Sequence, residues 1–221
     1  MAEAEDLVLN PKKTLTYRFC AIMIAGLAQV FFRPTVEGAG NIPLSGPVLI
    51  APIHRSNVDF AFSLFISPRK VFFMAKDGIF RVPLLGSLLT KLGAFPVNRN
   101  SADRESMRLG EEVLRRGQAL VLFPEGTRKE GDHVEPLHDG AMFLAARTGA
   151  MVVPVGIAGS DRAMPVGARF PRFSRIHIVV GTPITPPMSE GRVSRSAISA
   201  KTEELRRELE AVYEKSRQRM R

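Results

Sequence analysis

The chain has 221 residues, of which 45% are hydrophobic and 24% are charged. This suits one globular domain with a substantial core, and the composition excludes a disordered or collagen-like chain. A total of 31 Lys and Arg residues against 22 Asp and Glu residues gives a net charge of +9. Such a charge favours anionic partners: nucleic acid, anionic lipid headgroups or phosphorylated substrates. The single cysteine excludes an internal disulfide and suits a reducing compartment.

An apolar stretch over residues 15–32 predicts the first helix. Fourteen uncharged residues run from Phe19 to Phe32, between Arg18 and Arg33, whereas a spanning helix needs about 20. The flanking positions are basic, which favours a helix at a membrane interface with its apolar side in the acyl boundary. A buried core helix and a secretory signal are the alternatives.

Beyond residue 33, short apolar runs alternate with helical stretches. We predict strands over residues 48–53, 70–75, 119–123, 151–157 and 176–181. Helices are predicted over residues 101–116, with Ser101 as N-cap and Gly117 at the end, over 138–148, and along the basic C-terminus. The C-terminal helix keeps helical spacing at Ile198, Leu205, Leu209, Val212 and Tyr213. This alternation predicts an α/β fold, with a mixed, largely parallel central sheet flanked by helices.

A histidine and an aspartate follow the first of these strands. His54 and Asp59 lie five positions apart, about 140° away from one face of a regular helix. They can meet if His54 occupies the turn after the strand and Asp59 begins the next helix. A carboxylate bonded to one imidazole nitrogen leaves the other free to accept a proton. The pair is therefore a candidate general base with its orienting partner; the alternative is a solvated loop histidine.

Two further segments carry residues suited to a phosphorylated substrate. Residues 123–128 read Phe-Pro-Glu-Gly-Thr-Arg, where Gly126 lets the backbone approach a ligand and Arg128 offers a fork suited to phosphate. Glu125 can accept hydrogen bonds from hydroxyls. The second segment runs from Lys76 to Arg99. Taken alone, it also fits an apolar hairpin or helix with solvated ends.

In their order and intervals, these segments resemble the four sequence blocks of the glycerolipid acyltransferases, specifically the bacterial 1-acyl-sn-glycerol-3-phosphate acyltransferases. The His-x4-Asp block matches at His54 and Asp59, and the second block resembles residues 76–99. The third is matched residue for residue at 123–128, and the fourth is the Val-Pro-Val of residues 153–155. One departure is Asp139, which stands where relatives often present a lysine or arginine. A carboxylate pointing into a phosphate site there would be unfavourable.

The resemblance implies transfer of a fatty acyl group from an acyl thioester, acyl-CoA or acyl carrier protein, to a hydroxyl of lysophosphatidic acid. It makes His54 the general base and Asp59 its orienting partner. The residues that it implies in binding the glycerol phosphate are Lys76, Arg99, Glu125, Gly126, Thr127 and Arg128. We expect direct transfer without an acyl-enzyme, no cofactor beyond the donor, and no metal, because the histidines lack ligand spacing. Another lysophospholipid or glycolipid is the alternative acceptor.

We divide the chain into a basic and apolar membrane-associating segment, residues 1–33, and an α/β acyltransferase domain with a basic C-terminal helix, residues 34–221. Four arginines without an intervening acid, between residues 162 and 175, are expected to face anionic lipids. The expected location is the cytoplasmic face of the cell membrane, as a peripheral or monotopic protein. A nucleic-acid-binding module is a remote alternative, disfavoured because Trp is absent and Tyr numbers 2. A catalytically silent membrane protein is another alternative.

Overall fold

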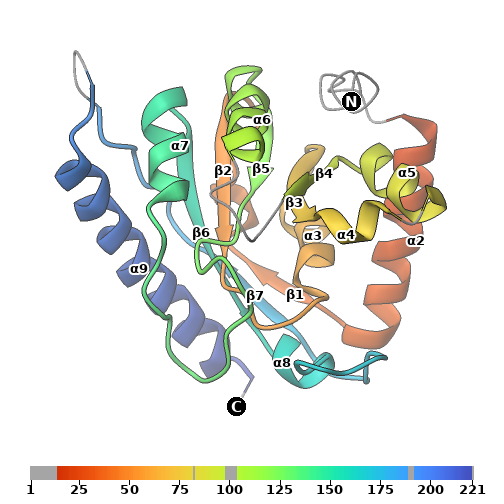
Figure 1. The fold of residues 1–221 in the computed structure, drawn as a ribbon. Coiled ribbons are helices and arrows are strands. Elements are labelled where there is room, and N and C mark those ends of the chain that lie inside the picture. The colour runs from red at the N-terminus through yellow and green to blue at the C-terminus, as the bar shows by residue number, and fades with distance from the viewer. Residues whose placement is uncertain (1–13, 82, 98–103, 189–191, 221) are drawn as a thin grey trace.

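A seven-stranded sheet lies at the centre of the molecule, and helices cover both of its faces (Figure 1). The computed structural model describes residues 14–81, 83–97, 104–188 and 192–220. Its strands are β1 (Thr35–Glu37), β2 (Val48–Pro52), β3 (Val71–Lys76), β4 (Ala94–Val97), β5 (Ala119–Val121), β6 (Met151–Ala158) and β7 (His177–Val180). Its longer helices are α2 (Leu15–Phe32), α5 (Pro83–Lys91), α6 (Arg104–Arg115), α7 (Gly140–Thr148) and α9 (Arg195–Gln218). The short helices are η1 (Ala39–Asn41), η2 (Asp59–Phe62), α3 (Ser63–Ile66), α4 (Asp77–Phe80) and α8 (Ser160–Ala163).

The strand order is β1-β7-β6-β2-β5-β3-β4. Every pairing among these strands is parallel except that of β6 with β7. The predicted mixed, largely parallel sheet is therefore confirmed. Because β7 runs back against β6, the loop that joins them leaves from the edge at which β2 and β5 also end.

The five predicted strands are present, with ends that differ by up to two residues. Two strands were missed, β1 and β4, and they form the two edges of the sheet. Each has three or four residues and pairs with one neighbour, so little apolar patterning is needed to hold it. In β4, Pro96 further masks the strand pattern in the sequence. Proline is tolerated there because β4 is an edge strand.

Residues of β2 alternate between two core clusters, one on each face of the sheet. Val48 and Ile50 pack in the cluster that includes residues of α2 and α3. Leu49 and Ala51 pack in the cluster that includes residues of α6, α7 and α9. All five residues of β2 are buried, as expected for a central parallel strand covered on both faces.

The helix predicted over residues 15–32 is confirmed as α2, and most of its surface is exposed. In the described part of the chain it is the one helix long and apolar enough to cross a membrane by length and composition, and 17% of it is buried. Only Tyr17, Ala28 and Phe32 are fully buried. An exposed apolar stripe runs along the other side, formed by Leu15, Phe19, Ile22, Met23, Leu27 and Val30. Such exposure is not that of a buried core helix.

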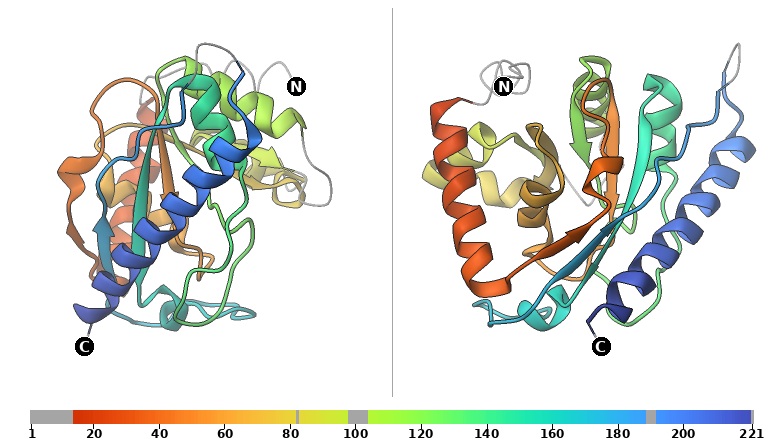
Figure 2. Two further views of the ribbon diagram at one scale, coloured as in Figure 1. Left: turned by 90° about the vertical axis from the view of Figure 1, so that its left-hand side faces the viewer. Right: turned by 180° about the vertical axis from the view of Figure 1, so that it is seen from behind.

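Three other predicted helices also occur. Helix α6 begins at Arg104 and α7 at Gly140, while the predicted N-cap Ser101 lies outside the described residues. Gly117 follows α6 with φ +69°, as expected for a helix-ending glycine. The five spaced apolar residues of α9 are all buried. They lay this helix across β6 (Figure 2).

The crossing of α9 over β6 requires a residue without a side chain at Gly156. A Cβ at this position would lie 2.4 Å from the Val212 carbonyl oxygen of α9. We expect Gly156→Ala to lower the free energy of unfolding by about 1–3 kcal/mol, because a backbone atom must move. Urea denaturation measures this loss. Gly40→Ala, which meets open space, is the matched control and should change stability by less than about 0.5 kcal/mol; equal effects would refute the close-packing argument.

Candidate active site

The sequence blocks meet at one edge of the sheet. His54 follows β2, the Phe-Pro-Glu-Gly-Thr-Arg loop follows β5, and Lys76 is the last residue of β3. Because β2, β5 and β3 are mutually parallel, their carboxyl ends lie together, where open α/β sheets bind ligands. Arg99 lies outside the described residues, as does the side chain of Lys76.

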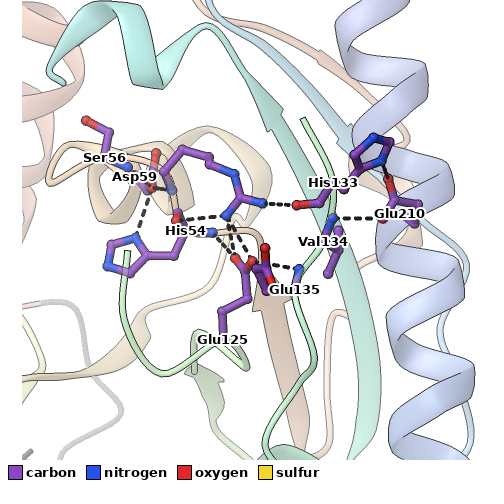
Figure 3. Close-up of polar contacts among 9 residues, drawn as sticks. His54, Ser56, Asp59, Glu125, His133, Val134, Glu135 and Glu210 are labelled. Carbon is purple, nitrogen blue, oxygen red and sulfur yellow. Dashed lines mark hydrogen bonds and ion pairs between the residues drawn. The ribbon is translucent and has the colours of Figure 1, made fainter. Parts of the chain in front are cut away.

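His54 and Asp59 are in contact, in the arrangement expected from their spacing. His54 lies in the turn after β2, and Asp59 is the first residue of η2. The Nδ1 atom of His54 lies 3.0 Å from Oδ2 of Asp59 (Figure 3). The same oxygen accepts the backbone N–H groups of Arg55 and Ser56 at 2.8 and 2.7 Å. A carboxylate oxygen can only accept, so Nδ1 is the donor in this contact and Nε2 is left with its lone pair.

The imidazole ring of His54 is held on its face as well as at its edge. It stacks on the ring of Phe123, with 4.0 Å between ring centroids and 23° between planes. His54 is 7% exposed. Among the described residues, no hydrogen-bond partner engages Nε2. The ring is thus fixed in direction while one nitrogen stays available to a ligand.

A buried ion pair joins the first block to the third. The Glu125 carboxylate accepts the backbone N–H of His54 at 3.0 Å and Nη1 of Arg55 at 2.8 and 2.9 Å. The side chains of Arg55 and Glu125 are 1% and 0% exposed. A charge buried to this extent needs its partner, because an unpaired one would be strongly destabilising. This pair therefore fixes the backbone of the histidine turn against the loop after β5.

The network continues to the loop before α7 and to α9. Arg55 Nη2 donates to the carbonyl of His133, and the Glu135 N–H is directed at Glu125 from 3.4 Å. Glu210 of α9 in turn accepts the backbone N–H of Val134 at 2.8 Å (Figure 3).

Tyr213 of α9 lies on the other side of this network. The Arg55 guanidinium lies 5.3 Å from the centre of the Tyr213 ring, within the range of a cation–π contact. Burial raises the pKa of the Tyr213 phenol above its ordinary value, so the ring faces the cation as a neutral phenol. Helix α9 thereby supports the histidine turn from behind.

The remaining residues of the third block lie at the surface of this edge. Gly126 has φ +72°, and a Cβ there would come within 2.9 Å of the His138 ring. Both the conformation and the space require glycine. Thr127 is exposed and Arg128 is half-buried. Among the described residues, no ion pair or hydrogen bond engages the Arg128 guanidinium, which leaves it available for an anion.

Two other polar side chains near this edge are already engaged. The hydroxyl of Ser56, fully buried, donates to the carbonyl of Met164 at 2.8 Å. Asp139 accepts the hydroxyls of Ser199 and Thr202 of α9 at 3.0 and 2.8 Å. Its carboxylate is thereby held by α9. The unfavourable contact with a phosphate, which its position in the sequence suggested, is thus removed.

The sequence did not indicate Arg55, Tyr213 or the support from α9. Arg55 could have been singled out from the sequence, because it lies within the His-x4-Asp block and closely follows a buried strand, where a solvent-exposed arginine is not expected. Its partner could not be found from spacing, because 70 positions separate Arg55 from Glu125.

Known proteins share the sequence family and the fold of this chain. A family model described as Acyltransferase matches residues 33–158, more than half of the chain. The chain is 27% identical over 200 residues to a 1-acyl-sn-glycerol-3-phosphate acyltransferase of Bacillus subtilis, covering 90% of this chain and 98% of that protein. It is 27% identical over 183 residues, 80% of its length, to a chloroplastic relative of the same name from Arabidopsis thaliana, of which it spans only 51%.

A third relative carries a different name. Over 132 residues, 59% of this chain and 50% of the relative, the chain is 33% identical to a lyso-ornithine lipid O-acyltransferase of Pseudomonas aeruginosa. Among solved structures, the 1-acyl-sn-glycerophosphate acyltransferase of Thermotoga maritima superposes with a TM-score of 0.72 at 22% identity, covering 95% of this chain and 85% of that one. This likeness confirms the fold. With the family model matched across β2 to β6, the chain belongs to the acyltransferase family.

Proposed function

We propose that the protein transfers a fatty acyl group from an acyl thioester, acyl-CoA or acyl carrier protein, to a hydroxyl of lysophosphatidic acid, giving phosphatidic acid. The observation that carries this proposal is the His54–Asp59 contact in a chain of the acyltransferase family. Relatives with the corresponding name in a bacterium and in a plant support the choice of acceptor.

In the proposed reaction, His54 Nε2 takes the proton of the acceptor hydroxyl while that oxygen attacks the thioester carbonyl. A hydroxyl is a poor nucleophile until its proton is removed, so a positioned base accelerates the step. Asp59 stabilises the imidazolium that forms. The C–S bond then breaks, and the imidazolium returns the proton to the leaving sulfur. No acyl-enzyme is needed, and the buried Ser56 hydroxyl, which donates to Met164, is not required as a nucleophile.

The acceptor phosphate is assigned to the surface residues of the same edge. Arg128 supplies an unpaired guanidinium and Gly126 an open backbone; Thr127, Lys76 and Arg99 complete the proposed site by family resemblance. Glu125 differs from these residues because both of its carboxylate oxygens are engaged by the protein. We assign it to positioning the histidine turn, so its predicted contact with substrate stays untested.

Both substrates are amphiphiles, so the enzyme is proposed to work at a membrane surface. The exposed apolar stripe of α2 suits the acyl boundary of a bilayer. We assign the protein to the cytoplasmic face of the cell membrane, as a peripheral or monotopic enzyme. The lyso-ornithine relative favours one second candidate, acylation of a lysolipid without a phosphate.

Replacing the base tests the chemistry directly. We expect His54→Ala to lower kcat by about 10²–10⁴-fold, the range for a general base, with an unchanged circular dichroism spectrum. Mass spectrometry of products from labelled acyl-CoA and lysophosphatidic acid measures turnover. Asp59→Asn should also lower kcat. A His54→Ala enzyme with full turnover would refute the assigned base.

Arg128 tests the acceptor. Losing a charge-assisted hydrogen bond of about 1.5–3 kcal/mol should raise KM for lysophosphatidic acid about tenfold or more in Arg128→Ala. The matched control is Arg116→Ala, an exposed arginine after α6 at the opposite edge of the sheet. If Arg128→Ala leaves KM unchanged, Arg128 is not in the phosphate site. Preferential turnover of lyso-ornithine lipid in the same assay would favour the second candidate.

The buried ion pair gives a separate prediction. Glu125→Gln leaves the Arg55 charge unpaired and should cost about 3–5 kcal/mol of stability, together with a lower kcat. The double variant Arg55→Met, Glu125→Leu should recover most of the stability but not kcat, because the His54 N–H has lost its acceptor. Urea denaturation and steady-state kinetics measure the two effects. If Glu125 instead contacts the acceptor, Glu125→Gln will raise KM without changing stability.

A further inference from the structure

The loop between α8 and β7 exposes large apolar side chains, which a surface that faces only water does not need. Val166, Phe170 and Phe173 are 47%, 78% and 74% exposed. We refer to residues 164–175 as the aromatic–arginine loop, because Arg169, Arg172 and Arg175 are exposed beside these apolar side chains. Exposed aromatic and aliphatic groups gathered with cations are typical of surfaces that enter a lipid interface.

The backbone of this loop is held in place, so the exposure is built into the fold. The Arg172 N–H donates to the Ala163 carbonyl at 2.7 Å. At the other end of the loop, the Ser174 and Ile176 N–H groups donate to the carbonyls of Phe31 and Phe32, the last residues of α2. These bonds fix the backbone on both sides of Phe173 relative to α8 and α2.

The loop extends the apolar stripe of α2. Phe173 stacks on Phe31 in the last turn of that helix, with 4.7 Å between centroids and 13° between planes. Figure 2 shows the loop against the carboxyl end of α2. Phe173 therefore places the loop beside the carboxyl end of this apolar stripe.

The charges of this loop differ from those of α9. On α9, most cations are paired with nearby acids, as in the pairs Arg206–Glu203, Lys215–Glu37 and Arg217–Glu214. In the described part of the chain, the exposed arginines at 162, 169, 172 and 175 form no ion pair. Unpaired cations beside apolar side chains match the anionic headgroups above an acyl layer, whereas most cations of α9 have an acidic partner.

The loop is also connected to the catalytic turn. Its first residue, Met164, accepts the buried hydroxyl of Ser56, two positions after His54. Both segments lie at the carboxyl edge of β2 and β6, because these strands are parallel. A surface that docks through this loop therefore brings the membrane to the edge from which the acceptor must enter.

We propose that the aromatic–arginine loop is a second membrane-docking element, separate from α2. Phe170 and Phe173 enter the acyl boundary of an anionic bilayer, and Arg169 and Arg172 bind its headgroups. This deepens the proposed function, since it gives the route by which a lipid acceptor reaches His54. A nucleic acid fits the proposal less well, because the adjoining stripe of α2 is apolar and uncharged.

Binding of the full chain to vesicles tests the loop without turnover. Phe170→Ser, Phe173→Ser should weaken binding to phosphatidylcholine vesicles containing about 30% phosphatidylglycerol by about tenfold or more, because two exposed aromatic rings no longer enter lipid. Arg169→Gln, Arg172→Gln should weaken binding to these vesicles but not to pure phosphatidylcholine, and the difference should vanish between about 0.1 M and about 0.5 M salt. Cosedimentation measures both.

The controls separate docking from folding and from catalysis. Leu44→Ser, 75% exposed on the loop before β2 at the opposite edge, and Arg116→Gln should bind vesicles as the unchanged protein does. Phe170→Ser alone controls for a local packing defect, because Phe170 is not part of the ring stack with Phe31. Turnover of a short-chain, detergent-dispersed acceptor should stay within about twofold in every loop variant, since the chemistry is untouched.

The outcomes distinguish this proposal from the proposed function. Vesicle binding unchanged in both double variants would overturn the docking element, whatever the enzyme acylates. Weakened binding in a protein that does not acylate lysophosphatidic acid would refute the function and keep the docking element. Arginine variants that lose polynucleotide binding but keep vesicle binding would point to a nucleic-acid surface and overturn the proposal.

Discussion

The active-site geometry depends on one buried carboxylate. Glu125 accepts both the backbone N–H of His54 and the Arg55 guanidinium, so the loop after β5 sets the position of the turn after β2. Such a pair lies out of water and is stable only when both partners are present. The family motif Phe-Pro-Glu-Gly-Thr-Arg thus combines two tasks: its glutamate and phenylalanine hold the histidine, and its later residues stay at the surface.

The sheet topology brings the His54–Asp59 pair and the aromatic–arginine loop to the same edge. Parallel pairing of β2 with β5 and β6 places their carboxyl ends together. The antiparallel return of β7 then carries the aromatic–arginine loop to that edge and ties it to the last turn of α2. In the proposed function, this arrangement turns the base toward the membrane surface that delivers the acceptor.

Helix α9 completes the support from the opposite side. Its apolar face is buried along β6, Tyr213 lies against the Arg55 guanidinium, and Glu210 holds the loop that contacts Glu125. Most of its cations are paired with acids. The helix therefore contributes to positioning and solubility, whereas the arginines of the aromatic–arginine loop lie on the other side, beside α2.

Short-range patterns in the sequence determined the central strands, α2, the buried face of α9 and the meeting of His54 with Asp59, because these depend on local periodicity and on a turn of five residues. The sequence could not determine the edge strands β1 and β4, which are short and have one neighbour each. Nor could it indicate that Arg55 pairs with Glu125, that Asp139 turns to α9, or that Phe173 stacks on Phe31. These contacts join residues far apart in the chain, and only the strand order, set by packing of the whole core, brings them within reach.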